Sequence, residues 1–201
     1  MLSEFIVEND LGKVEVKKNF KEVIELKYLP KGTLLHEKGK PLVKNFFILK
    51  GIARCFMYKD GKEITTYFAT DNSPIVAIDV IENDNKVSML TIELLDDSIV
   101  AEIQFHKIRD IIFSDLNYSI KYCYYLDNEY RKLAMNQITN RFTTAKERYM
   151  KFCKENPEIL RKVKLSHIAS YLDISLETLS RIRTEQKPRR LKQFQEMLIK
   201  K

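Results

Sequence analysis

The feature that most constrains the fold is the spacing of apolar residues in "VKLSHIASYLDISLETLSRIR", residues 163–183. Two short helices that cross steeply in so small a unit need a small residue where their backbones approach, an unusual turn residue and a fixed apolar set. Ala169 is the small residue, and Asp173 lies where a left-handed turn residue would be. The spacing therefore predicts a helix-turn-helix, held together by Ile168, Leu172, Ile174, Leu179 and Ile182.

The second of these helices, expected at residues 175–184, carries a polar face that its packing does not need. Ser175 is expected to cap the helix by accepting a hydrogen bond from a free backbone N–H. Arginine can make two hydrogen bonds to guanine O6 and N7, and glutamate can accept one from cytosine N4. We therefore predict base contacts by Glu177, Ser180 and Arg181. Alternatively, Glu177 and Arg181 form only a surface ion pair, one helical turn apart.

Basic residues are concentrated in the same part of the chain. Residues 131–201 contain 18 lysines and arginines against 7 acidic residues, in a chain whose net charge is +7. This asymmetry favours a polyanionic partner such as double-stranded DNA, although a basic surface that is merely solvated has the same composition. We predict contacts to DNA phosphates by Lys164, Ser166, His167, Thr178, Arg183, Lys187, Arg189 and Arg190.

Residues 27–103 contain short β-rich runs such as "KEITTYFAT" and "SIVAEI". Glycines punctuate these runs, and the Asp60-Gly61 pair is a signal for a hairpin. The pattern predicts an N-terminal antiparallel β-roll and, with the helices that follow, an α+β fold. A roll can enclose a ligand, but the same alternation is needed merely to make a core.

A long helix is expected from about residue 105 to residue 140, where residues recur at intervals of three and four. The seam is narrow and mostly apolar, which is typical of a two-stranded coiled coil. Packing of the seam against the chain's own roll is the other possibility. The predicted dimer seam consists of Leu116, Ile120, Cys123, Leu126, Tyr130 and Leu133. We expect three parts: a roll at 1–104, a connecting and dimerisation helix at 105–140, and a helix-turn-helix domain at 141–201.

The cysteines indicate no metal or redox site. Cys55, Cys123 and Cys153 lie far apart and form no CxxC or Cys/His ligand spacing. We therefore expect a reducing compartment, no metal and no resident cofactor. The start has no apolar core of signal-peptide length, and no run of roughly eighteen apolar residues occurs, so a cytoplasmic location is expected. No triad-like set of residues supports an enzyme.

The order of roll, long helix and helix-turn-helix resembles the Crp/Fnr superfamily of bacterial transcription regulators. The resemblance rests on "TIELLDDSIVAEIQFHKIRDII" before the long helix and "HIASYLDISLETLSRIR" near the C-terminus. Its most specific element, "SLETLSR" at residues 175–181, is similar to the recognition helix of the Fnr branch. The resemblance implies a cupin-like roll related to cyclic-nucleotide-binding domains, a homodimer on a two-fold-related operator, and RNA polymerase as a partner.

The sequence departs from that family at the signal-sensing positions. The places of the cyclic-phosphate cassette fall near residues 76–77 and 87–89, "VA" and "VSM", which offer no charge to a phosphate. The cysteine cluster of Fnr-type oxygen sensors has no counterpart in residues 1–54. After the recognition helix, "TEQKPRRLKQFQEMLIKK" has helix-like spacing where many members have a β-hairpin wing. We therefore expect an apolar or uncharged effector, or none.

These patterns together predict a homodimeric DNA-binding transcription regulator. The main alternative is a helix-turn-helix protein that serves protein interaction without sequence-specific DNA reading. That alternative would not need the outward Glu177 and Arg181.

Overall fold

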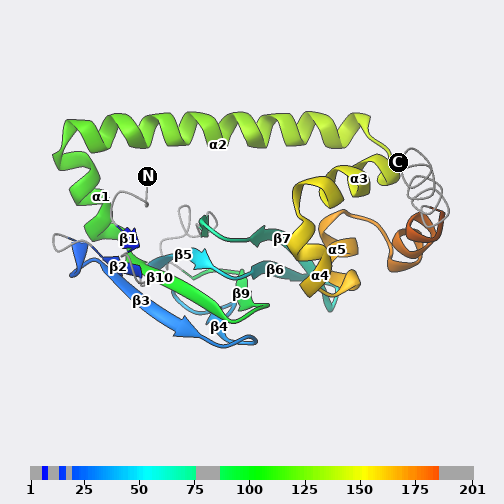
Figure 1. Ribbon diagram of the computed structural model, residues 1–201, viewed down its shortest axis with the longest axis horizontal. Coiled ribbons are helices and arrows are strands. Elements are labelled where there is room, and N and C mark those ends of the chain that lie inside the picture. The colour runs from blue at the N-terminus through cyan, green and yellow to red at the C-terminus, as the bar shows by residue number, and fades with distance from the viewer. Residues whose placement is uncertain (1–5, 9–13, 17–19, 76–86, 186–201) are drawn as a thin grey trace, which may run out of the picture.

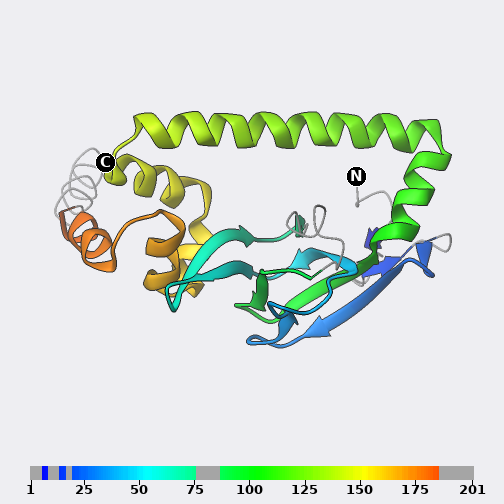
Figure 2. The same ribbon diagram turned by 180° about the vertical axis from the view of Figure 1, so that it is seen from behind.

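Figure 1 shows the fold, a computed structural model in which residues 6–8, 14–16, 20–75 and 87–185 are described. One long helix, α2 (Leu116–Phe142), runs along the length of the molecule. The β-sheets lie beside one half of it and the C-terminal helices beside the other end, as the reverse view in Figure 2 also shows. No helix in these described ranges is long and apolar enough to cross a membrane.

The strands form two antiparallel four-stranded sheets, with the orders β3-β10-β5-β8 and β4-β9-β6-β7. Their bounds are β3 Ile24–Leu29, β4 Leu34–His36, β5 Lys44–Lys50, β6 Ala53–Lys59, β7 Lys62–Ala69, β8 Ser73–Ile75, β9 Thr91–Leu94 and β10 Ser98–Gln104. A separate pair joins β1, Ile6–Glu8, to β2, Val14–Val16. The antiparallel sheets and the helices make an α+β chain, as predicted.

The Asp60-Gly61 pair forms the predicted hairpin between β6 and β7. Asp60 has a φ of 50° and Gly61 a φ of 75°. Two-residue hairpin turns of type I′ need such positive φ values at both positions, which is why this pair of residue types is common there. Lys59 and Lys62, on either side of the turn, pair with each other. β7 is the last strand in its sheet, so only one of its edges is paired with a strand.

Apolar side chains from both sheets fill the space between them. Ile48, Ile92, Leu94 and Val100 have no exposed surface and belong to one cluster that draws on strands of each sheet. Burying such a side chain contributes about 1.5–3 kcal/mol, so this cluster is a main source of the roll's stability. Cys55 lies in the same cluster, and burial raises the pKa of its thiol to about 12.

The long helix expected at residues 105–140 is two helices in the structure. α1 is Phe105–Ser114, and α2 begins at Leu116. Between them Asp115 has an extended backbone, and its carboxylate accepts hydrogen bonds from the backbone N–H of Asn117 at 2.8 Å and of Tyr118 at 3.2 Å. An aspartate that caps a new helix in this way ends the preceding one. The expectation of one uninterrupted helix is therefore wrong.

The C-terminal helices are α3 Ala145–Glu155, α4 Pro157–Lys162, α5 Leu165–Tyr171 and a further helix at residues 176–185. α3 begins with a capping box, in which the Thr144 side chain and the Glu147 side chain each bond the other's backbone N–H. The core of these helices also takes in side chains from the sheets. Its sheet members are Ile52, Phe68 and Leu95.

Candidate nucleic-acid interface

The turn between α5 and the helix at 176–185 has the predicted left-handed residue. Asp173 has a φ of 53°, a value that aspartate tolerates better than most residues. The N–H of Ile174 donates to the carbonyl of Ala169 at 3.1 Å, which closes the turn. Ala169 itself is buried where the two helices meet. Both predictions for this turn are confirmed.

The predicted apolar set holds the two helices together. Leu179 and Ile168 have no exposed surface, Leu172 and Ile182 are buried, and Ile174 is half-buried against the same cluster. Because the second helix turns this row toward α5, its opposite face is left to solvent.

Ser175 caps the second helix, as predicted. Its Oγ accepts a hydrogen bond from the backbone N–H of Thr178 at 3.1 Å. A hydrogen bond from the backbone N–H of Glu177, together with the Ser175 hydroxyl, holds the pKa of the Glu177 carboxyl below its usual range. Glu177 is therefore ionised at neutral pH and is an acceptor for an exposed amino group.

The three predicted base-contact residues share the solvent-facing side of this helix. Glu177, Ser180 and Arg181 are all exposed. Arg183 and Thr184 continue the polar surface, and the hydroxyl of Thr184 donates to the Ser180 carbonyl at 3.0 Å. The helix therefore offers one anionic, one cationic and one neutral hydrogen-bonding group along a single face.

The predicted phosphate-contact residues are more dispersed. Lys164, Ser166 and Arg183 are exposed, whereas Thr178 is half-buried and its hydroxyl accepts a hydrogen bond from Ser175. His167 is half-buried, and its Nδ1 is enclosed. The remaining predicted residues, Lys187, Arg189 and Arg190, lie outside the described part of the chain. The C-terminal segment whose spacing predicts a helix in place of a wing also lies outside it.

Every residue of the predicted dimer seam is exposed on α2. The exposed fraction is 75% for Leu116 and 72% for Tyr130, and α2 has no buried residue. The side of α2 that faces its own chain uses other residues, since Tyr118 and Tyr122 pack against the cluster of α1 and the first sheet. The protomer thus carries a row of uncovered apolar side chains: Leu116, Ile120, Cys123, Leu126, Tyr130 and Leu133.

The expected cassette positions are described only in part. Residues 76–77 lie outside the described ranges. In the second part, Val87 pairs with Pro41 through an isolated bridge, and Ser88 is fully buried with its Oγ accepting a hydrogen bond from the Leu90 N–H. The two residues flanking Ser88, Val87 and Met89, are uncharged, as the sequence states.

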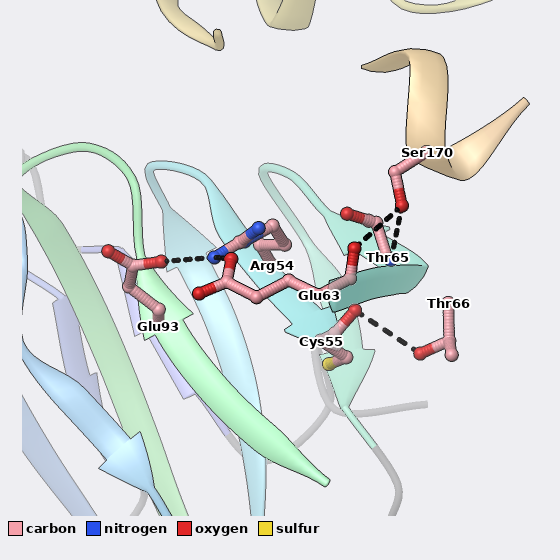
Figure 3. Close-up of polar contacts among 7 residues, drawn as sticks. All are labelled: Arg54, Cys55, Glu63, Thr65, Thr66, Glu93 and Ser170. Atoms are coloured by element: carbon pink, nitrogen blue, oxygen red, sulfur yellow. Dashed lines mark hydrogen bonds and ion pairs between the residues drawn. The ribbon is translucent and has the colours of Figure 1, made fainter. Parts of the chain in front are cut away.

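No spacing in the sequence indicates the contact between β7 and α5. Ser170 of α5 bonds the backbone of β7, and Arg54, in the neighbouring strand β6, pairs with Glu63 and Glu93 (Figure 3). These residues come from four separate elements. Such a contact depends on tertiary packing, and local spacing carries no signal for it.

No protein-family model matches the sequence, and no curated protein matches it. Solved structures do match. FixK2 from Bradyrhizobium japonicum superposes with a TM-score of 0.66 at 18% identity, over 83% of this chain and 86% of that one. CLP, a c-di-GMP-responsive global regulator from Xanthomonas campestris, superposes with a TM-score of 0.62 at 12% identity, over 85% of this chain and 90% of that one. A cyclic-nucleotide-binding-domain-containing protein from Listeria monocytogenes superposes with a TM-score of 0.60 at 15% identity, over 84% of each chain.

The chain has the Crp/Fnr fold. The likeness is not confined to the sheets, because the residues up to the end of α1 make up less than three fifths of the chain and the matches cover more than four fifths. The matched part of the chain therefore extends beyond the sheets and α1. At these identities the likeness concerns the fold, and function has to be argued from the side chains.

Proposed function

We propose that this protein is a homodimeric, DNA-binding regulator of transcription of the Crp/Fnr type. Its helix at residues 176–185 would enter the major groove of a two-fold-related operator. In this proposal the roll at 1–104 is the sensor-like part, the helices up to residue 140 join the subunits, and residues 141–201 bind DNA. Double-stranded DNA, a second copy of the chain and RNA polymerase are the proposed partners.

The observation that carries the proposal is the two-sided character of the second helix. One side is closed by Leu179 and Ile182, and the other presents Glu177, Ser180 and Arg181 to solvent. A helix that only stabilises a domain needs the first side alone. The second side has the donors and acceptors that read base edges in the major groove.

The dimer is supported by the uncovered seam of α2. Large apolar side chains spaced at three and four residues along a 27-residue helix are typical of a helix that pairs with its equivalent. Pairing α2 with a second α2 would place two reading helices about a two-fold axis. Such dimers read half-sites about one helical turn apart, near 34 Å.

The effector of the roll is proposed to be apolar or uncharged, if the protein has one. The core between the sheets is already filled by side chains such as Ile48, Leu94 and Val100. Any small molecule would therefore bind elsewhere in the roll, away from this cluster.

The test is a fluorescence-anisotropy titration with duplexes from the region upstream of the protein's own gene. Specific binding should weaken steeply with salt, with log K falling by about 0.9 for each phosphate contact per tenfold rise in salt. Random duplexes of equal length are the control. Salt-insensitive binding, or equal affinity for every duplex, would contradict the proposal.

A further inference from the structure

The hydroxyl of Ser170 occupies the open edge of β7. Its Oγ accepts a hydrogen bond from the backbone N–H of Thr65 at 2.9 Å and donates one to the carbonyl of Glu63 at 3.1 Å (Figure 3). One side chain of α5 thus satisfies the two backbone groups that a neighbouring strand would otherwise bond. An unpaired strand edge presents free N–H and C=O groups that can bond another chain. The Ser170 hydroxyl bonds two such groups and so joins α5 directly to the backbone of the sheet.

Three further contacts join the sheets to the C-terminal helices. The ring of Phe68 in β7 lies 5.3 Å from that of Tyr171 and 6.2 Å from that of Phe152. Lys162 at the end of α4 forms an ion pair with Asp96, which lies between β9 and β10. We call these contacts, with the Ser170 bonds, the β7–α5 contact.

A group of charges lies next to this contact. Arg54 is 2% exposed, and its Nη2 pairs with Glu63 at 2.7 Å and with Glu93 at 2.9 Å. Its Nε and Nη1 are buried and, within the described part of the chain, have no hydrogen-bond partner. The buried Nδ1 of His167 on α5 also lacks a partner among the described residues. A buried arginine and a buried imidazole nitrogen therefore lie beside the contact, each with a polar atom that no described residue bonds.

We propose that the β7–α5 contact is a pH-sensitive latch: at neutral pH it holds α5 against the edge of the sheet, and protonation of His167 releases it. The link to transcription control rests on the proposed function above, whereas the latch itself does not.

The charges that surround His167 explain the direction of the switch. Burial and then the nearby Arg54 lower the pKa of His167 from its ordinary 6.5, as does Lys164 at the start of α5; Glu93 and Glu63 act in the opposite sense without reversing the shift. A lowered pKa means that the latched form binds the proton less well than the released form. Latching is therefore fully favoured above about pH 6.5 and weakens as the pH falls below that value.

The latched form has two features that disfavour DNA. It encloses Nδ1 of His167, one of the predicted phosphate contacts. It also keeps the carboxylates of Glu63 and Glu93 near the start of α5, where they repel phosphates. Release removes both features, so acidification should strengthen DNA binding.

The first experiment measures the latch without DNA. The Thr65 amide is bonded to Ser170 Oγ, so its hydrogen-exchange protection factor, corrected for the intrinsic pH dependence, reports the latched fraction. In the unaltered protein this factor should fall by up to about tenfold for each pH unit below 6.5. His167→Gln, which cannot gain the proton, should show a flat profile, and Ser170→Ala should show low protection at every pH.

Ser114→Ala is the matched control, because that hydroxyl bonds only within α1. Amides of the central strand β10 report whether the fold survives in each variant. Equal pH dependence at Thr65 in the unaltered protein and in His167→Gln, with β10 still protected, would overturn the proposal. So would Thr65 protection that does not fall between pH 7.5 and pH 5.5.

The second experiment separates the latch from the proposed function. Ser170→Ala should bind DNA more tightly than the unaltered protein at pH 7.5, and the difference should shrink at pH 5.5. Weaker or unchanged binding at pH 7.5 would show that the latch does not oppose DNA. If no variant binds DNA, the proposed function fails, while the Thr65 exchange profile still decides whether the latch exists.

Discussion

The aromatic ring of Phe68, in the last strand of the second sheet, lies 5.3 Å from the ring of Tyr171, in α5. The two residues are more than a hundred positions apart, and the rings are tilted by 58°. Through Phe68 the core of the C-terminal helices continues onto the face of the sheet, together with Ile52 and Leu95. We therefore expect the roll and the C-terminal helices to unfold together.

Phe68→Ala should reduce this coupling. Removing a buried phenylalanine side chain costs about 3–5 kcal/mol where the surroundings cannot collapse. Urea denaturation followed by circular dichroism should show a lower midpoint, and the single transition should separate into two. Tyr28→Ala is the control, because Tyr28 is largely exposed, and it should change stability by less than about 0.5 kcal/mol. A normal midpoint in Phe68→Ala would show that the contact does not couple the two parts.

Base and phosphate contacts should respond differently to arginine removal. Arg181→Ala should cost about 1–3 kcal/mol on the preferred operator and relax preference at one base pair. Arg183→Ala should weaken all duplexes alike and lower the salt slope by about one. Anisotropy titrations against operator and random duplexes measure both. Equal losses for the two variants on the two kinds of DNA would refute the assignment of the reading face.

A charge in the seam of α2 should dissociate the dimer. Leu126→Glu would place two carboxylates against each other in an apolar interface, where unpaired charge is strongly disfavoured. Sedimentation equilibrium should then report a single chain of 23.8 kDa. Met135→Glu, at an exposed apolar position outside the predicted seam, should remain dimeric. A dimer that survives Leu126→Glu but not Met135→Glu would move the interface to another face of α2.

Cysteine reactivity should distinguish the core from the seam. Burial raises the pKa of Cys55 to about 12, so its thiol stays protonated and unreactive at pH 8. Because its ordinary pKa is 9.0, the free energy of unfolding should fall as the pH rises above that value. Cys123 is exposed in the protomer, and it should react with a thiol reagent faster in Leu126→Glu than in the dimer. Equal rates in both would argue against Cys123 in the seam.

Cyclic AMP should not bind. The cassette positions offer no positive side chain, so a cyclic phosphate would lose its water without gaining an ion pair. Isothermal titration calorimetry should show no heat of binding up to millimolar ligand, and mass spectrometry of the native protein tests for a retained neutral compound. Micromolar affinity for cyclic AMP, with stronger DNA binding, would show that the interpretation of the cassette is wrong.

Features that depend on neighbouring residues could be predicted from the sequence. The turn at Asp173, the cap at Ser175 and the hairpin at Asp60-Gly61 each follow from the backbone preferences of one or two residues. The apolar row that joins the two C-terminal helices follows from helical periodicity, because the same spacing that makes a stripe also decides which side is buried. The break at Asp115 had a local signal too, an aspartate able to cap a helix, but the periodicity of the flanking residues masked it.

The position of the C-terminal helices against the sheet was decided only by tertiary structure. No spacing in the sequence relates Ser170 to Thr65, or His167 to Arg54, because they are brought together by the closure of separate elements. The sequence by itself determined which side chains of the second helix face away from its core. The tertiary structure decided that the Ser170 hydroxyl of α5 bonds the edge of β7. The physical reason is that unpaired backbone groups at a strand edge need hydrogen-bond partners, and only the fold determines which polar group reaches them.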